Sequence, residues 1–183
     1  MALRLEHLDQ IEAAVWRELA VATRDKDHEL RMGVLATSTA EGLADARSVV
    51  LRDLDLRTRS LVFYTDSRSP KVAQIALQPQ GTLVLWSARL EWQLRLRVTL
   101  SIETAGLTVS SRWARLKMTP AAHDYLSPLP PGSPIDRPLP SRGSREFFAV
   151  ATAAVTAVDW LELHAEGQRR ALFDEQGRRW LTP

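Results

Sequence analysis

Cations and hydroxyl side chains gather between Arg47 and Lys71, where the chain could bind an anion. Arg47 and Arg52 flank a short apolar run, and farther along Ser69, Pro70 and Lys71 are consecutive. A helix that begins at Pro70 would direct free backbone N–H groups and the positive end of its dipole at an anion, because proline at the first helical position loses no hydrogen bond. Lys71 would add a point charge in the first turn of this helix. These residues therefore predict a site for a phosphate group.

Alternating apolar and polar residues predict that strands position this site. The clearest alternation runs from Trp92 to Ile102, so one face of this strand should be buried while the other is wet or in an interface. The segment Phe147–Leu163 predicts a long strand that bends near Ala157. Further strands are expected at Leu30–Ser38, Ala44–Arg52, Arg59–Tyr64 and Thr82–Trp86, with a closing hairpin of Arg169–Asp174 and Arg178–Leu181.

Helices are expected to flank these strands. Apolar residues at intervals of three and four predict an amphipathic helix at about 7–23 that packs on one end of the barrel. Six prolines between Ser127 and Arg142 exclude regular structure and predict a long loop, of the length that usually has a function. Shorter helices are expected at Pro70–Leu77, Leu107–Met118 and Pro120–Leu126.

Composition narrows the class of protein. A chain of 183 residues, 45% hydrophobic and 25% charged, suits a single domain, which we place at 1–183. A net charge of +2 does not describe the basic surface of a nucleic-acid-binding protein. The lack of cysteine excludes disulfides and thiolate chemistry, and the four scattered histidines predict no metal site. No apolar run approaches the roughly 18 residues of a membrane span and no signal-peptide core is present, so we expect a cytoplasmic protein without a membrane partner.

Four short motifs occur in an order that resembles the pyridoxamine 5′-phosphate oxidase family and its wider group of FMN-binding split barrels. They are Arg47 to Arg52, which fits R-x-V-x-L-[KR], then Phe63-Tyr64-Thr65, Ser69-Pro70-Lys71 and Gln93. Each motif alone is weak, but the ordered set is fairly specific. The likeness returns near the end of the chain, at Val158-Asp159-Trp160 and from Arg170 to Phe173.

The resemblance implies a mainly β fold, an antiparallel split barrel of six to seven strands with flanking helices. It also implies a homodimer with FMN at the subunit interface. In the family the equivalent of Arg47 reaches the FMN phosphate, a role that suits a planar guanidinium able to bind phosphate oxygens bidentately. Gln93 would meet the pyrimidine edge of the flavin, where an amide can donate and accept hydrogen bonds. The implied FMN-binding residues are Arg47, Ser48, Val49, Val50, Leu51, Arg52, Tyr64, Thr65, Ser69, Lys71, Gln93, Trp160 and Arg170.

Several of these residues also have a simpler structural interpretation. Arg47 and Arg52 could be solvated residues that protect a strand edge, and Gln93 could be an ordinary surface residue. A tryptophan is by default a core residue. The alignment at Trp160 is open by one position, because the neighbouring acidic and aromatic residues can be matched so that Leu161 takes the flavin-facing place.

Two departures from the family pattern bear on the reaction. Pro128 stands where an arginine that binds the substrate phosphate is expected, and Glu166-Gly167-Gln168 replaces an Arg-x-His on the last hairpin. A carboxylate would repel a phosphate, so the contacts to vitamin B6 phosphates are altered. The predicted function is an FMN-dependent oxidoreductase that acts on an unidentified small molecule, with no catalytic residue named. The alternative is a non-catalytic protein that binds or senses flavin or haem.

Overall fold

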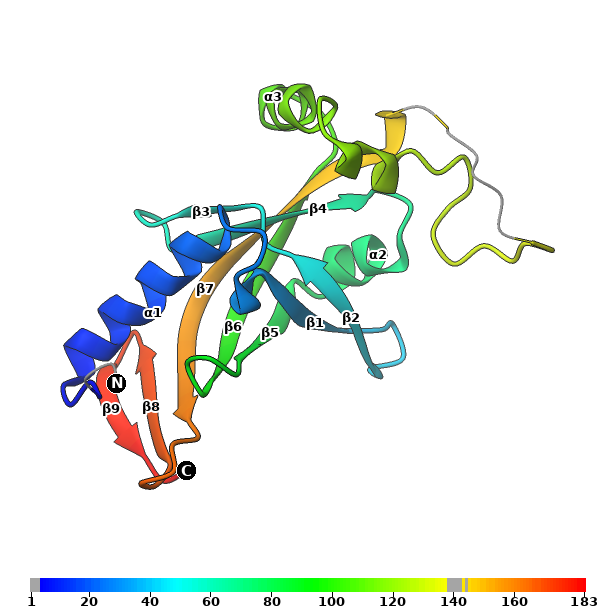
Figure 1. Ribbon diagram of the computed structural model, residues 1–183. Helices are drawn as coiled ribbons and strands as arrows, with labels where there is room; N and C mark the ends of the chain where they lie inside the picture. Colours follow the sequence, from blue (N-terminus) through cyan, green and yellow to red (C-terminus); the bar gives the residue numbers. More distant parts are fainter. Residues whose placement is uncertain (1–3, 138–142, 144) are drawn as a thin grey trace.

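An antiparallel sheet dominates the computed structural model, which describes residues 4–137, 143 and 145–183 (Figure 1). Within these residues the sheet has nine strands in the order β2-β1-β5-β6-β7-β4-β3, with β8 paired to β7 and β9 to β8. The strands are β1 (Met32–Ser38), β2 (Ala44–Val50), β3 (Asp53–Asp55), β4 (Ser60–Asp66), β5 (Gln80–Ser87), β6 (Trp92–Glu103), β7 (Phe148–Glu162), β8 (Arg169–Asp174) and β9 (Gly177–Leu181). The mainly β class and antiparallel pairing are confirmed, although the strands outnumber the six or seven expected. With only three residues, β3 is too short for an alternating pattern to show.

The long strand β7 joins the other strands into one sheet. Its first half pairs with β4, its second half pairs with β8, and β6 runs along its whole length. The pairing with β6 shifts where Arg97 lies opposite Ala157 but Val98 lies opposite Val155, which leaves Thr156 as an extra residue. Such a bulge bends a strand and increases its twist. The predicted bend near Ala157 is therefore confirmed.

Helices lie around the sheet (Figure 1). They are the α-helices α1 (Leu8–Ala22), α2 (Pro70–Leu77) and α3 (Leu107–Leu116), and the short 3₁₀ helices Glu29–Arg31, Pro120–Tyr125 and Arg145–Phe147. Helix α1 contacts β3 and β9 and buries Ile11, Val15 and Leu19 completely, as its apolar spacing predicts. No helix among the described residues is long and apolar enough to cross a membrane.

The apolar residues form two clusters. The main one fills the barrel and includes Leu35, Leu83, Leu96 and Trp160. The second lies between α3 and the opposite face of β4 and β7, around Trp113. The predicted loop at 127–142 has no helix or strand from 127 to 137, whereas residues 138–142 lie outside the described residues.

Candidate functional site

The predicted phosphate-binding residues come together where β4 ends and α2 begins. The Lys71 Nζ donates hydrogen bonds to Ser69 Oγ at 2.8 Å and to Thr65 Oγ1 at 3.1 Å. Helix α2 begins at Pro70 and Ser69 is its N-cap, as the sequence predicts. We call Arg47, Thr65, Ser69 and Lys71 the phosphate turn.

Arg47 reaches this turn from β2, where three side chains and the carbonyl oxygen of Leu35, at 3.2 Å, hold it. Its guanidinium donates to Thr37 Oγ1 at 2.6 Å and to Gln74 Oε1 at 2.9 Å, and it lies 2.5 Å from Asp45 Oδ2. The Gln74 amide also donates to Asp45 Oδ2 at 2.7 Å and accepts from Thr37 Oγ1 at 2.6 Å. Four elements (β1, β2, β4 and α2) thus fix the cations of the turn before any ligand arrives.

The three side chains that hold Arg47 were missed by the sequence analysis. Gln74 follows Lys71 by three positions, so helical periodicity places both on the same side of α2. This spacing was the one signal that could have identified it. Thr37 and Asp45 face each other across β1 and β2, and that register is not visible in the sequence.

The charges in this region explain what the phosphate turn can bind. Burial lowers the pKa of Lys71, and the nearby charge of Arg47 lowers it further, although Asp66 and Asp45 act in the opposite direction. The hydrogen bond from Gln74 lowers the pKa of Asp45, and Arg47 adds to this effect. Two cations held near each other, one of them partly buried, favour a bound anion, because an anion would stabilise both charged forms.

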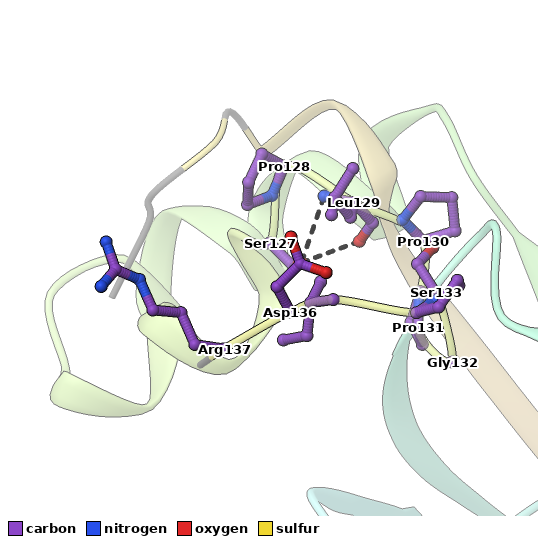
Figure 2. Close-up of a pocket in the computed structure, with 11 residues that line it drawn as sticks. Ser127, Pro128, Leu129, Pro130, Pro131, Gly132, Ser133, Asp136 and Arg137 are labelled. Carbon is purple, nitrogen blue, oxygen red and sulfur yellow. Dashed lines mark hydrogen bonds between the residues drawn. The ribbon is translucent and has the colours of Figure 1, made fainter. Parts of the chain in front are cut away.

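The adjacent loop is tied to the phosphate turn by Arg68. Its guanidinium donates to the carbonyl oxygens of Ser127 at 2.8 Å, Pro128 at 3.1 Å and Leu129 at 3.3 Å, and it pairs with Asp66 at 2.6 Å. Residues 127–137 enclose a cavity of about 850 Å³, and Figure 2 shows that the Ser127 hydroxyl bonds within the loop to Leu129. None of the predicted site residues lines this cavity.

Gln93 and Arg170 lie on the other face of the sheet from Arg47. Arg47 is opposite Leu35 on β1. On β5 and β6 the side chains of this same face are buried in the core. Gln93 is opposite Leu161, which is opposite Arg170, so these three share the outer face. We call them the outer-face set. Because side chains alternate between the faces of a strand, the outer-face set and Arg47 cannot point to the same side of the sheet.

The structure also places the two candidates for the flavin-facing position near the end of β7. Trp160 is 0% exposed, opposite Leu94 and Ala171, with its ring against the Trp92 ring in the core. Leu161 is the residue on the face with Gln93 and Arg170. The structure therefore does not bring Trp160 together with the other predicted site residues.

The remaining predicted residues lie at the end of β2 and in β4. Because side chains alternate along a strand, some of these residues are on the buried side of the sheet and others are on the outer side. Val49 and Leu51 are buried in the main cluster, whereas Ser48 and Val50 lie on the outer side. Arg52 follows β2 and donates to the Tyr125 hydroxyl at 3.3 Å, with its guanidinium 5.7 Å from the centre of the Tyr64 ring. Val50, Arg52 and Tyr64 line a cavity of about 670 Å³, which we call the outer cavity.

Comparison with known proteins identifies a family that this chain matches. A family model described as "Pyridoxamine 5'-phosphate oxidase, FMN-binding domain" matches residues 13–104. A protein of Trichormus variabilis named pyridoxine/pyridoxamine 5′-phosphate oxidase is 40% identical over 81 residues, which are 44% of this chain and 36% of that protein. A protein of the same name from Caulobacter vibrioides is 26% identical over 161 residues, covering 81% of this chain and 72% of that protein. The match to the Trichormus protein thus spans little more than a third of its length.

Solved structures support the fold. A pyridoxamine 5′-phosphate oxidase-related, FMN-binding protein from Nostoc punctiforme is 26% identical with a TM-score of 0.72, over 93% of this chain and 96% of that one. PhzG from Burkholderia lata 383, solved in complex with tetrahydrophenazine-1-carboxylic acid, gives a TM-score of 0.79 at 15% identity, over 100% of this chain and 99% of that one. The second likeness concerns the fold alone. The predicted split barrel is confirmed.

Proposed function

Because the chain belongs to the pyridoxamine 5′-phosphate oxidase family of FMN-binding domains, we propose that it is an FMN-dependent oxidoreductase acting on a small molecule. FMN is the cofactor of this domain family and of the protein. The observation that carries the proposal is the phosphate turn, where Arg47 and Lys71 are fixed beside two hydroxyl groups at the first turn of α2. This donor set fits the phosphate of FMN.

The remaining predicted residues suit the flavin ring. When bound, FMN supplies hydride or electron transfer, and the protein orients the ring and sets its charge environment. The Gln93 amide has no hydrogen-bond partner among the described residues, which leaves it free to donate and accept at the pyrimidine edge. Arg170 is oriented by a bidentate pair with Asp159, at 3.0 and 2.7 Å, and would place a positive charge on the same face. A positive charge there would stabilise a reduced, electron-rich ring.

We further propose a homodimer with FMN between the subunits. The phosphate turn and the outer-face set lie on opposite faces of the sheet, so one ligand would meet both sets if each came from a different subunit. The outer face also exposes large apolar side chains, with Met32 60%, Val34 44% and Trp86 45% exposed. Apolar patches of this kind mark interaction surfaces, and a two-fold interface would bury the same patch on both subunits.

Vitamin B6 phosphates are not the substrates in this proposal. The carbonyl of Pro128 accepts a hydrogen bond from Arg68, so the local cation is already engaged. Glu166 is an exposed carboxylate 3.9 Å from Arg4. Because the local cation is engaged and a carboxylate stands at position 166, the FMN-loaded protein should turn over pyridoxamine 5′-phosphate slowly. The expected rate is far below about one per second, the low end of ordinary enzyme values.

The purified protein tests the proposal in two steps. Its absorbance spectrum, recorded before and after addition of FMN, should show bound flavin with shifted bands. Anaerobic mixing with NADH, NADPH or candidate amines should then bleach the flavin at catalytic rates with at least one of them. A protein that neither carries FMN nor is stabilised by it would overturn the proposal, and bound flavin that no reductant reaches would favour the non-catalytic alternative.

A further inference from the structure

We propose that Arg95, Asp159 and Arg170 form a charge network that sets the reduction potential of the bound flavin, with Asp159 as its positioning residue. This inference rests on the proposed function, because a reduction potential requires FMN beside the network. Arg95 is two positions from Gln93 on β6, and Asp159 is two positions from Leu161 on β7. Because alternate side chains of a strand share a face, the charge network lies on the same face as the outer-face set and adjoins it.

The carboxylate of Asp159 is shared by two arginines from neighbouring strands. Arg170 on β8 donates to it from Nε to Oδ1 at 3.0 Å and from Nη2 to Oδ2 at 2.7 Å. Arg95 lies directly opposite Asp159 in the register of β6 and β7 and donates from its own Nη2 to the same Oδ2. One carboxylate on β7 therefore fixes a guanidinium group of β6 and another of β8.

Asp159 is more buried than either of its partners. Its side chain is 13% exposed, whereas the side chains of Arg95 and Arg170 are 42% and 27% exposed. Burial alone would raise the pKa of Asp159, but the hydrogen bonds and charges of Arg170 and Arg95 outweigh burial and lower this pKa. The carboxylate is therefore ionised at neutral pH, and the guanidinium groups that it holds are the more accessible part of the network.

The charge network carries one net positive charge. Arginine is always protonated in proteins, so two cations share a single anion. Among the described residues no second carboxylate pairs with Arg95 or Arg170, and the other acid of this hairpin side, Asp174, is engaged by Arg179 at 2.6 Å. The Nη1 groups of Arg95 and Arg170 have no hydrogen-bond partner in the described part of the chain, so both can still donate to a ligand.

This net charge favours the reduced state of a flavin, because reduction adds electrons to the ring and a nearby positive charge stabilises them. Without the carboxylate of Asp159, the two arginines would present a charge of +2. Without Arg95, the remaining pair of Asp159 and Arg170 would be neutral. Arg95 thus makes the difference between a charged network and a neutral pair, and Asp159 keeps that charge at an intermediate value.

The experiment changes the charge of the network in both directions and measures the midpoint potential of the FMN-loaded protein by anaerobic titration against a reference dye. Asp159→Asn leaves a charge of +2, and Arg95→Gln leaves none. We expect the affinity for reduced relative to oxidised FMN to rise about tenfold in Asp159→Asn and to fall about tenfold in Arg95→Gln, or about 30 mV upward and downward for a two-electron couple. The double variant Arg95→Gln/Asp159→Asn restores the charge of +1 and should return close to the wild-type potential.

Asp174→Asn is the matched control, since it removes a carboxylate that is also paired with an arginine but lies at the far end of β8. It should leave the potential near the wild-type value. Potentials that do not follow the charge of the network would overturn the inference. An unchanged potential in Arg95→Gln is sufficient for this even where Asp159→Asn does not fold, because Arg95 is 42% exposed and the pair of Asp159 and Arg170 remains. Failure of the wild type to bind FMN is a different result, because it overturns the proposed function itself.

Discussion

The phosphate turn and the outer-face set differ in how much of their surroundings a single chain supplies. In the phosphate turn, side chains from four elements hold Arg47 and Lys71 by hydrogen bonds of 2.6–3.1 Å. The outer-face set lies on a surface with exposed apolar neighbours, and the Gln93 amide has no hydrogen-bond partner among the described residues. One half of the proposed flavin site is therefore preorganised within the chain, whereas the other half depends on what covers it. This difference can be tested from both sides.

The largest effect is expected from a charge on the outer face. Val34→Glu would place one carboxylate from each subunit in the proposed two-fold interface, where like charges cost several kcal/mol. The dimer should dissociate and FMN affinity should fall by about a hundredfold or more, because one free-energy linkage governs both events. Sedimentation at falling protein concentration, with and without FMN, measures both.

The matched control is Leu56→Glu, which changes an equally apolar residue that is 57% exposed but lies in the turn after β3. It should leave assembly and FMN affinity unchanged. A Val34→Glu monomer that keeps the wild-type FMN affinity would show that one chain suffices for the site.

The second effect concerns the phosphate turn. Arg47→Ala or Lys71→Ala should each weaken FMN binding by ~1.5–3 kcal/mol, the range for hydrogen bonds to charged groups, or about ten- to a hundredfold. Riboflavin, which lacks the phosphate, should bind equally to the variants and the wild type. Isothermal titration with both ligands measures this, with the exposed Lys117→Ala as control. Unchanged FMN affinity in both variants would remove the turn from the site.

A smaller effect is expected from Gln74, which we regard as a positioning residue. Gln74→Ala removes hydrogen bonds to Arg47 and Asp45 and should weaken FMN binding by ~1 kcal/mol, or about fivefold, the usual value of one hydrogen bond. The affinity for riboflavin should again be unchanged. An equal loss for riboflavin would indicate a general structural defect.

The smallest effect is on the stability of the protein without FMN. The pKa of Lys71 is lower in the folded state than in the unfolded chain, so the folded state binds fewer protons in the alkaline range between these two values. Charged Lys71 therefore reduces stability at neutral pH, and this penalty disappears as the pH rises through that range. Lys71→Met should raise the melting temperature at pH 7, and its advantage should vanish above the ordinary lysine pKa of about 10.4. A lower melting temperature at pH 7 would contradict this sign.

The sequence alone predicted those parts of the site whose residues lie close together along the chain. Helix α2 follows from Pro70 and the apolar spacing after it, so the meeting of Thr65, Ser69 and Lys71 was predictable from residues that are near one another in the chain. The face on which Gln93 and Arg170 lie depends on the register of three strands, and sequence alone left Trp160 and Leu161 as alternatives. The network around Arg47 could not be predicted, because Asp45 and Thr37 meet only when β1 and β2 pair. Strand β3 was missed because three residues carry no period.

The position of β7 in the sheet also determines when the edges of its neighbouring strands become paired during translation. This strand lies between β6 and β4, yet it is made after both of them. Until Phe148–Glu162 has left the ribosome, β4 and β6 each have an open edge of unpaired backbone groups, and such edges can pair with other chains. The nascent protein thus carries two vulnerable edges from the completion of β6 at Glu103 until β7 is complete at Glu162. Ribosome pausing before residue 148 should therefore expose it to aggregation more than pausing after residue 162, when a single strand has closed both edges.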